Sequence, residues 1–303
     1  MVKVGNSYYI SLPKELVNNW GLTVGSLVAI EYRGSDAKLY PLTALKDRSK
    51  ERATLVSDEY VEKRMISAYL NGYDEIELVI KGDRERVSNA IERALKLLVG
   101  LEVVEEDSNR VLLQCFTSSD YNVYSIIKRL DYLSRSMYLD AVKALVEGGE
   151  LASAVVERDD KVDRLYFFAV RLIRRAFKEG LRSREELLRL LDCRLVAKSL
   201  EGIGDRGESI AKEVLNGLKV YDHVYDALLT ASKEMAELQK RLVKSFIDGG
   251  QLTMKDIERS FLRISSRLDR LLTGKSPSYF NVVEALRSIL EEVNDVYDLA
   301  KRC

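Results

Sequence analysis

The sequence is poor in histidine, and this shortage excludes several kinds of site. His223 is the single histidine among 303 residues. Zinc sites with several histidines, two-histidine iron sites and the Glu-x-x-His ligands of ferritin-like proteins therefore cannot form within one chain. A Ser-His-Asp triad would have to include His223, and no nucleophile elbow lies near it. These absences argue against an enzyme, including a carboxylate-bridged phosphatase or oxidase.

Cysteines are also few, the first residues show no apolar signal segment, and the net charge is zero. The three cysteines, Cys115, Cys193 and Cys303, are too few and too widely spaced for a disulfide framework or a Cys-x-x-Cys zinc site, which favours a reducing compartment. The first residues lack an apolar signal region, and no stretch approaches 18 uncharged apolar residues. We therefore expect a soluble, cytoplasmic protein without membrane insertion. The 48 basic and 48 acidic residues cancel, so any DNA contact must use a local patch.

Proline is also scarce, and its positions favour long helices. No proline lies between Pro41 and Pro277, and from about residue 118 the apolar pattern is helical with breaks at glycines. The first and fourth predicted helices both end in an acidic residue followed by two glycines. This weak repeat predicts two related three-helix bundles, in domains 118–217 and 218–303. The predicted helices are 119–147, 150–178, 183–216, 219–248, 253–273 and 277–301.

The first 116 residues have a mixed pattern. Residues 1–43 predict a β-rich run at 8–12, a helix that begins at Pro13 and stops at Gly21, and two further strands at 27–32 and 38–40. So short a domain buries too little surface to be stable alone, and dimerisation is expected. Residues 44–53 are predicted to be a charged linker. Residues 54–116 predict a small α/β sandwich, with helices 58–70 and 84–99 and strands 75–80, 101–104 and 111–116.

Acidic residues four apart give the clearest chemical signal. Asp159 and Asp163 form one such pair and Glu201 and Asp205 a second pair on the next predicted helix, and each pair lies on one helix face. If the two helices pack together, the four carboxylates suit hard or borderline cations such as Mg²⁺, Mn²⁺, Ca²⁺ or Fe. The alternative is a solvated acidic face, which is common in a chain that is 32% charged. Glycines 202, 204 and 207 each cost a helix roughly 1 kcal/mol, which indicates a close approach of a helix or ligand.

These residues carry a resemblance to a known family. Residues 200–206 (Leu-Glu-Gly-Ile-Gly-Asp-Arg) and the following Ile-Ala at 210–211 are similar to the signature of PhoU proteins, and residues 158–163 resemble the segment on the preceding PhoU helix. Residues 290–295 repeat the pattern, although Ser260 and Asn294 depart from it. The resemblance covers about 118–303 and implies two bundles that bind multinuclear clusters of divalent or trivalent ions (Fe, Zn, Mg, Mn or Ca). The implied ligands are Asp159, Asp163, Glu201 and Asp205, with Glu291, Asp295 and Asp256 in the second bundle.

The N-terminal residues resemble a second family. Residues 4–7 (Val-Gly-Asn-Ser), residues 10–15 (Ile-Ser-Leu-Pro-Lys-Glu) and Gly21 and Gly25 are similar to the AbrB/SpoVT swapped-hairpin domain. The resemblance implies an intertwined homodimer, and many members bind DNA through basic residues. A net charge of about +3 per chain over residues 1–53 suits weak, salt-sensitive DNA binding. A dimerisation domain without DNA contact is the alternative. The expected DNA-binding residues are Lys3, Asn6, Lys14, Arg33 and Lys38.

Together these patterns predict a multidomain, mainly α protein that regulates phosphate uptake. It would bind metal in its bundles and DNA through its N-terminus, as a transcriptional regulator. The alternative is an interaction protein without DNA contact that regulates a phosphate transporter ATPase or a sensor protein by direct docking.

Overall fold

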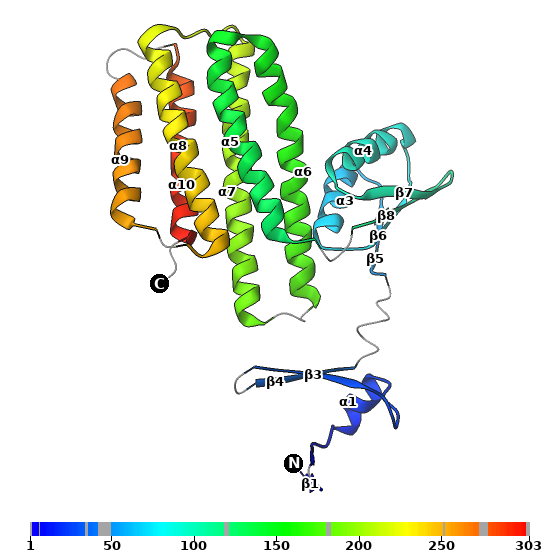
Figure 1. The fold of residues 1–303 in the computed structure, drawn as a ribbon. Helices are drawn as coiled ribbons and strands as arrows, with labels where there is room; N and C mark the ends of the chain where they lie inside the picture. Colours follow the sequence, from blue (N-terminus) through cyan, green and yellow to red (C-terminus); the bar gives the residue numbers. More distant parts are fainter. Residues whose placement is uncertain are drawn as a thin grey trace. The chain divides into compact units, whose positions relative to one another are not determined.

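The computed structural model describes residues 2–5, 7–33, 36–41, 50–117, 121–179, 183–250, 252–272 and 278–300. The chain forms two compact units, Met1–Glu51 and Arg52–Cys303. As predicted, it is a multidomain and mainly α protein (Figure 1). Among the described residues, no helix combines the length and the apolar character needed to cross a bilayer.

The N-terminal unit consists of two hairpins and a short helix. Strands β1 (Val2–Val4) and β2 (Ser7–Tyr9) pair antiparallel, α1 spans Lys14–Asn19, and β3 (Val28–Arg33) pairs antiparallel with β4 (Asp36–Pro41). The helix begins directly after a proline, as the sequence predicts, whereas β1 was not predicted.

The described residues of this unit form almost no interior of their own. Helix α1 has no buried residue, and Tyr8, Val24 and Leu27 are 66%, 107% and 70% exposed. A unit of this size with so many exposed apolar side chains buries too little surface to be stable alone. The predicted dimerisation would bury this exposed apolar surface against a second copy of the chain.

Residues 52–115 form a four-stranded sheet with helices α3 and α4. The strand order is β5-β6-β8-β7, with β5 parallel to β6 and the other neighbours antiparallel. Buried side chains of the sheet and the two helices share one core, which includes Met65, Tyr69, Ile76 and Leu113. The elements are β5 (Arg52–Val56), α3 (Val61–Leu70), β6 (Glu75–Val79), α4 (Arg84–Leu97), β7 (Leu101–Glu106) and β8 (Arg110–Cys115).

Both predicted helices and all three predicted strands of this unit are present, but the linker prediction was wrong at its end. Arg52 and Ala53 belong to β5, where Arg52 lies opposite Glu75. The guanidinium of Arg52 contacts the carboxylate of Glu75 at 2.7 Å. This pairing with a distant strand holds the two residues in the sheet, and a local sequence pattern cannot show it. Residues 44–49 lie outside the described residues.

The helical part confirms the six predicted helices within a few residues. Glycines end α5 and α8, with positive φ at Gly148 and Gly249, and the side chain of Ser183 caps the start of α7 in a capping box with Glu186. The helices are α5 (Val123–Glu147), α6 (Gly149–Glu179), α7 (Arg184–Leu215), α8 (Asp222–Asp248), α9 (Met254–Leu271) and α10 (Phe280–Ala300).

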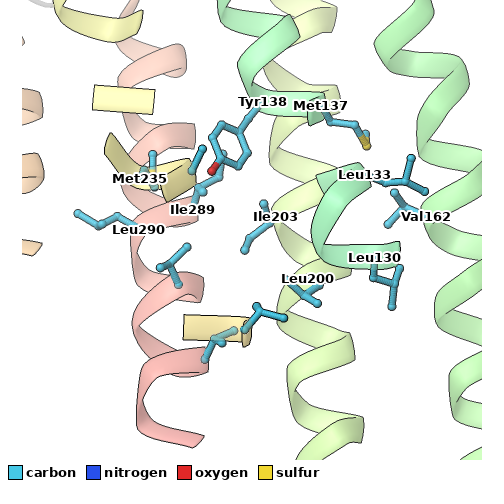
Figure 2. Close-up of a cluster of buried hydrophobic side chains, with 14 of the residues drawn as sticks. Leu130, Leu133, Met137, Tyr138, Val162, Leu200, Ile203, Met235, Ile289 and Leu290 are labelled. Carbon is cyan, nitrogen blue, oxygen red and sulfur yellow. The ribbon is translucent and has the colours of Figure 1, made fainter. Parts of the chain in front are cut away.

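These helices pack as two groups of three around one continuous apolar core. Helices α5, α6 and α7 pack together, as do α8, α9 and α10, and the two groups meet where α5 contacts α8 and α7 contacts α10. Figure 2 shows part of this core, with Met137 of α5, Val162 of α6, Ile203 of α7, Met235 of α8 and Ile289 of α10.

A buried polar network fixes the register of α5 against α8. The fully buried Gln239 donates from Nε2 to Oδ1 of Asp131 at 3.0 Å and to Oγ of Ser134 at 3.1 Å, and its Oε1 accepts from the hydroxyl of Tyr138 at 3.2 Å. Arg135 donates twice to Asp131, at 3.0 and 2.7 Å. Because every member has partners, the network favours one alignment of the two groups.

The three glycines of α7 explain how closely its neighbours approach. A Cβ atom at Gly207 would lie 3.0 Å from both the backbone nitrogen of Tyr138 and Cβ of Met137, and one at Gly204 would lie 3.1 Å from Cγ1 of Val162. A Cβ atom at Gly202 would meet the carboxylate of Glu292 at 2.9 Å. The close approach inferred from the sequence is therefore made by α5, α6 and α10.

We predict that Gly207→Ala destabilises the protein. The added methyl group would press on the α5 backbone, which cannot rotate away, so the free energy of unfolding should fall by roughly 1–3 kcal/mol. Chemical denaturation followed by circular dichroism measures this change. The control is Gly149→Ala, where the nearest atom is Cδ2 of Leu215 at 3.7 Å, and this variant should be neutral or slightly stabilised. Equal effects in the two variants would contradict the close packing at Gly207.

Candidate metal centre

Two adjacent helices of the first group bring three of the predicted aspartates together. Asp159 and Asp163 lie one turn apart on α6, and Asp205 faces them from α7. Each offers one carboxylate oxygen, and these oxygens all lie within 4.8 Å of one another. Gly204 of α7 lies beside the group: a Cβ atom there would be in ordinary van der Waals contact with Oδ1 of Asp159, at 3.6 Å.

The aspartates carry negative charge that their surroundings do not balance. Burial, followed by repulsion from Asp163, Glu208 and Asp205, raises the pKa of Asp159 to about 7. Burial, followed by repulsion from Glu201 and Asp205, raises the pKa of Asp163 to about 6. Burial and Glu201 also raise the pKa of Asp205. Such shifts show that the deprotonated forms are unfavourable without a cation.

One oxygen of this group has no hydrogen-bond partner. Oδ1 of Asp159 is buried and makes no hydrogen bond with any described residue. A buried acceptor without a partner costs roughly 1–3 kcal/mol, and more when it is charged. A cation between α6 and α7 would satisfy this oxygen and remove the repulsion at the same time.

Two lysines at the edge of the group pair with two further acids of α7, Glu201 and Glu208. Lys198 forms an ion pair with Glu201, which is only 9% exposed. Lys212 lies 2.6 Å from Glu208. Glu201 therefore shares the helix face, as predicted, but its carboxylate contacts Lys198 and lies outside the three-aspartate group. Glu208 was not predicted, although its spacing of seven residues from Glu201 could have placed it on this face.

The donor set fits a hard or borderline cation. Three carboxylates from two helices supply only oxygen ligands, which Mg²⁺, Ca²⁺ and Mn²⁺ prefer and Fe accepts. If a metal binds here, Asp159, Asp163 and Asp205 would hold it. Glu208 and Glu201 act on Asp159 and Asp163 through their charge, but their carboxylates pair with lysines.

The second group of helices does not bring its predicted ligands together in the described residues. Glu291 and Asp295 on α10 and Asp256 on α9 are all exposed, and none belongs to a cluster of three possible ligands. Asp256 lies 3.8 Å from Arg259. The acid of α10 that turns inward is Glu292, beside Gly202, and burial raises its pKa. A metal site in this group stays a prediction.

The predicted DNA-binding residues lie on the N-terminal unit. Lys3 on β1 and Lys14 at the start of α1 are exposed, and Nζ of Lys3 lies 5.9 Å from the ring centre of Tyr8. Arg33 and Lys38 belong to β3 and β4. Asn6 lies outside the described residues.

The fold and the site define a helical-bundle protein with a carboxylate cluster and a small N-terminal β-rich domain. Comparison with models of known protein families identifies two domains. Residues 127–214, which lie in α5 to α7, match the PhoU domain. Residues 1–47 match the model described as antidote-toxin recognition MazE, bacterial antitoxin. No curated protein matches the chain. The PhoU resemblance is thus confirmed for the first group of helices, which carries the aspartates, and the N-terminal resemblance is confirmed as an AbrB-like domain of the MazE type. For the second group of helices the PhoU resemblance stays a prediction.

We predict that the metal-free protein becomes less stable as the pH rises from about 4 to about 7. Unfolded aspartates have a pKa of about 3.9, whereas Asp159 and Asp163 titrate near 7 and 6 in the folded protein. Between these values the folded state binds more protons than the unfolded state, so stability falls with rising pH. Urea unfolding of chelator-treated protein across this range measures the slope. Asp159→Asn should flatten it, and an unchanged slope in that variant would contradict the assignment.

Proposed function

We propose that this protein is a metal-binding regulator of phosphate uptake and not an enzyme. The observation that supports it most directly is the three-aspartate group between α6 and α7, which lies within the PhoU domain. A cation there would replace the repulsion among Asp159, Asp163 and Asp205 by attraction and would tie the two helices together. The metal therefore serves the conformation of the bundle and supplies no reaction step.

We further propose that the protein is a homodimer that binds DNA through its N-terminal domain as a transcriptional regulator. The exposed apolar side chains of that unit support dimerisation. The exposed Lys3 and Lys14 support contact with phosphates, and a dimer doubles their number. Because phosphate contacts release counterions, this binding would weaken steeply with salt.

A second candidate function is docking on a transporter ATPase or a sensor protein without DNA contact. A row of exposed leucines on α7 favours it: Leu188, Leu191 and Leu195 are 54%, 48% and 49% exposed. Their spacing of three and four residues places them on one helix face, as in helices that pack against a partner.

We predict that purified protein carries metal and that Asp159→Asn with Asp205→Asn removes it. Elemental analysis after purification without chelator measures the content. Added Mn²⁺ or Mg²⁺ should also raise the melting temperature of the chelator-treated native chain but not of the double variant, because a ligand of the folded state stabilises it by mass action.

The matched control is Asp160→Asn, which removes one charge from the same turn of α6 at an exposed position. This variant should retain its metal. The pair Asp295→Asn with Asp256→Asn tests the second predicted site in the same assay. Full metal content in the Asp159 and Asp205 double variant would refute the site.

We predict a salt-sensitive gel shift of DNA by the full chain. Lys3→Gln with Lys14→Gln should weaken binding and reduce the slope of log affinity against log salt by roughly one for each phosphate that a lysine no longer neutralises. Lys63→Gln is the control, because this exposed lysine of α3 lies outside the N-terminal unit. If no DNA shifts at low salt, the protein-docking function replaces the DNA-binding one.

A further inference from the structure

Strand β5 gives the four-stranded sheet an outer edge. Among the described residues it is an outer strand, next to β6 (Figure 1). An outer strand presents backbone N–H and C=O groups on one side, and a strand of another chain can pair with them. The opposite outer strand, β7, is protected against such pairing by a bulge between Val103 and Glu105 and by exposed glutamates. In contrast, β5 pairs with β6 over five residues without a register shift and contains no proline. Its outer edge is therefore regular enough to accept a further strand.

The hydrogen bonds around β5 show which of its residues face this edge. Ser57, directly after the strand, donates its N–H to the carbonyl of Val79 on β6 at 2.9 Å. In a parallel pair, alternate residues direct their N–H and C=O groups to the same neighbour. The odd-numbered residues of β5 therefore bond to β6, whereas the even-numbered residues, with Thr54 at the centre, direct their groups outward. In agreement with this, the carbonyl of Val56 accepts from Nη1 of Arg64 on α3 at 3.2 Å.

A surface cavity lies along the same edge. It measures about 390 Å³ and is lined by β5 from Arg52 to Leu55 and by residues of α3 that include Ser67 and Asn71. Neighbouring strands lie about 4.8 Å apart, so a strand that paired with Thr54 would run along this cavity. The edge thus offers both the backbone groups and the space that a further strand needs.

We propose that this edge pairs antiparallel with β5 of a second copy of the chain, with the two Thr54 residues opposite each other. The two sheets would then form one continuous sheet. Because Thr54 directs both its N–H and its C=O outward, the two copies of Thr54 would exchange two hydrogen bonds, as in the hydrogen-bonded pairs of an antiparallel ladder.

The side chains of β5 suit this register. Arg52 would lie opposite Val56 of the other copy, so the two arginines would not face each other, and Val56, which is 41% exposed, would be covered by the aliphatic part of an arginine. The half-buried Ala53 and Leu55, which pack against the core of the sheet unit, would lie opposite one another. A parallel pair would instead place Arg52 beside its own copy, where like charges repel.

The connectivity of the chain favours a second copy over another partner. Strand β4 ends at Pro41 and β5 begins at Arg52, and the ten residues between them reach at most ~36 Å. A dimer of the N-terminal unit would therefore hold two β5 strands near each other at a high effective concentration, at which a weak strand pairing is enough. The interface rests on the proposed homodimer for its affinity, but it needs neither metal nor DNA.

Cysteine cross-linking of the full chain tests the register. In a Cys303→Ser background, in which Cys115 and Cys193 are buried, Thr54→Cys should form an intermolecular disulfide on mild oxidation with a copper reagent. Opposite residues of a hydrogen-bonded pair have Cα atoms about 5.5 Å apart, which is within disulfide range. The matched control is Val56→Cys on the same exposed face. Its two copies would lie about 14 Å apart along the strands and should stay unlinked. Equal linking of the two variants, or no linking of folded Thr54→Cys, would overturn the proposal.

Thr54→Pro tests the same edge without a new thiol. The N–H of Thr54 does not bond to β6, so an outer strand tolerates proline at this position, and the circular dichroism spectrum should match that of the native chain. Because several backbone hydrogen bonds with the second copy are lost together, dimerisation should weaken at least roughly tenfold in a sedimentation dilution series. The control is Thr54→Val, which loses the 3.1 Å bond from the hydroxyl to Glu77 but keeps the backbone N–H and should dimerise like the native chain.

Sedimentation of the native chain separates this interface from the proposed homodimer. A native chain that stays monomeric at every concentration refutes both. A native dimer that is not weakened by Thr54→Pro, or that lacks the cross-link specific to Thr54→Cys, refutes the β5 interface alone and leaves the N-terminal dimer in place.

Discussion

The close approach of α7 to α5 and α6 is the constraint on which the rest of the structure depends. Glycines at 204 and 207 bring the α5 backbone and the side chains of α6 against the α7 backbone, so apolar burial draws the three helices together along their length. The same packing forces Asp159, Asp163 and Asp205 within 4.8 Å of one another. Without a cation the aspartates oppose this packing, as their raised pKa values show. Apolar packing of the three helices therefore holds the aspartates closer together than their mutual repulsion alone would allow.

Much of this architecture could be predicted because it is local in the sequence. Glycine breaks and apolar periodicity fix the helices, and i, i+4 spacing places the aspartates of α6 on one face. What escaped prediction depends on distant partners. Residues 52–53 join a strand only because β6 lies beside them, Glu201 leaves the aspartate group because Lys198 holds it, and Glu292 turns inward because Gly202 leaves room on α7. No local pattern distinguishes Glu291 from Glu292, so the inward-facing acid of α10 could not be chosen from the sequence.

The two groups of three helices have the same order of helices, but their second helices, α6 and α9, carry different charges. In the first, α6 presents two aspartates to α7; in the second, the corresponding helix α9 exposes Asp256 and carries Arg263, Arg267 and Arg270 on one face. The core that joins the groups is continuous, and the network around Gln239 aligns them. The charges on α6 and α9 can differ in this way because surface charge can change without disturbing buried packing.

Helix α6 connects the candidate metal centre to the sheet unit. Arg171 donates to the carbonyl of Tyr69 at 2.7 Å, at the C-terminal end of α3 where helix carbonyls carry partial negative charge, and Arg175 lies 2.9 Å from Asp74. Arg171 follows Asp163 by eight residues, which is about 12 Å along a helix. A cation shifts a conformational equilibrium only if it binds one arrangement more tightly. If a cation binds the aspartates, its affinity depends on the spacing between α6 and α7, because the ligands come from two helices. Helix α6 is also the helix that Arg171 and Arg175 join to Tyr69 and Asp74, so one helix carries both the aspartates and the contacts with the sheet.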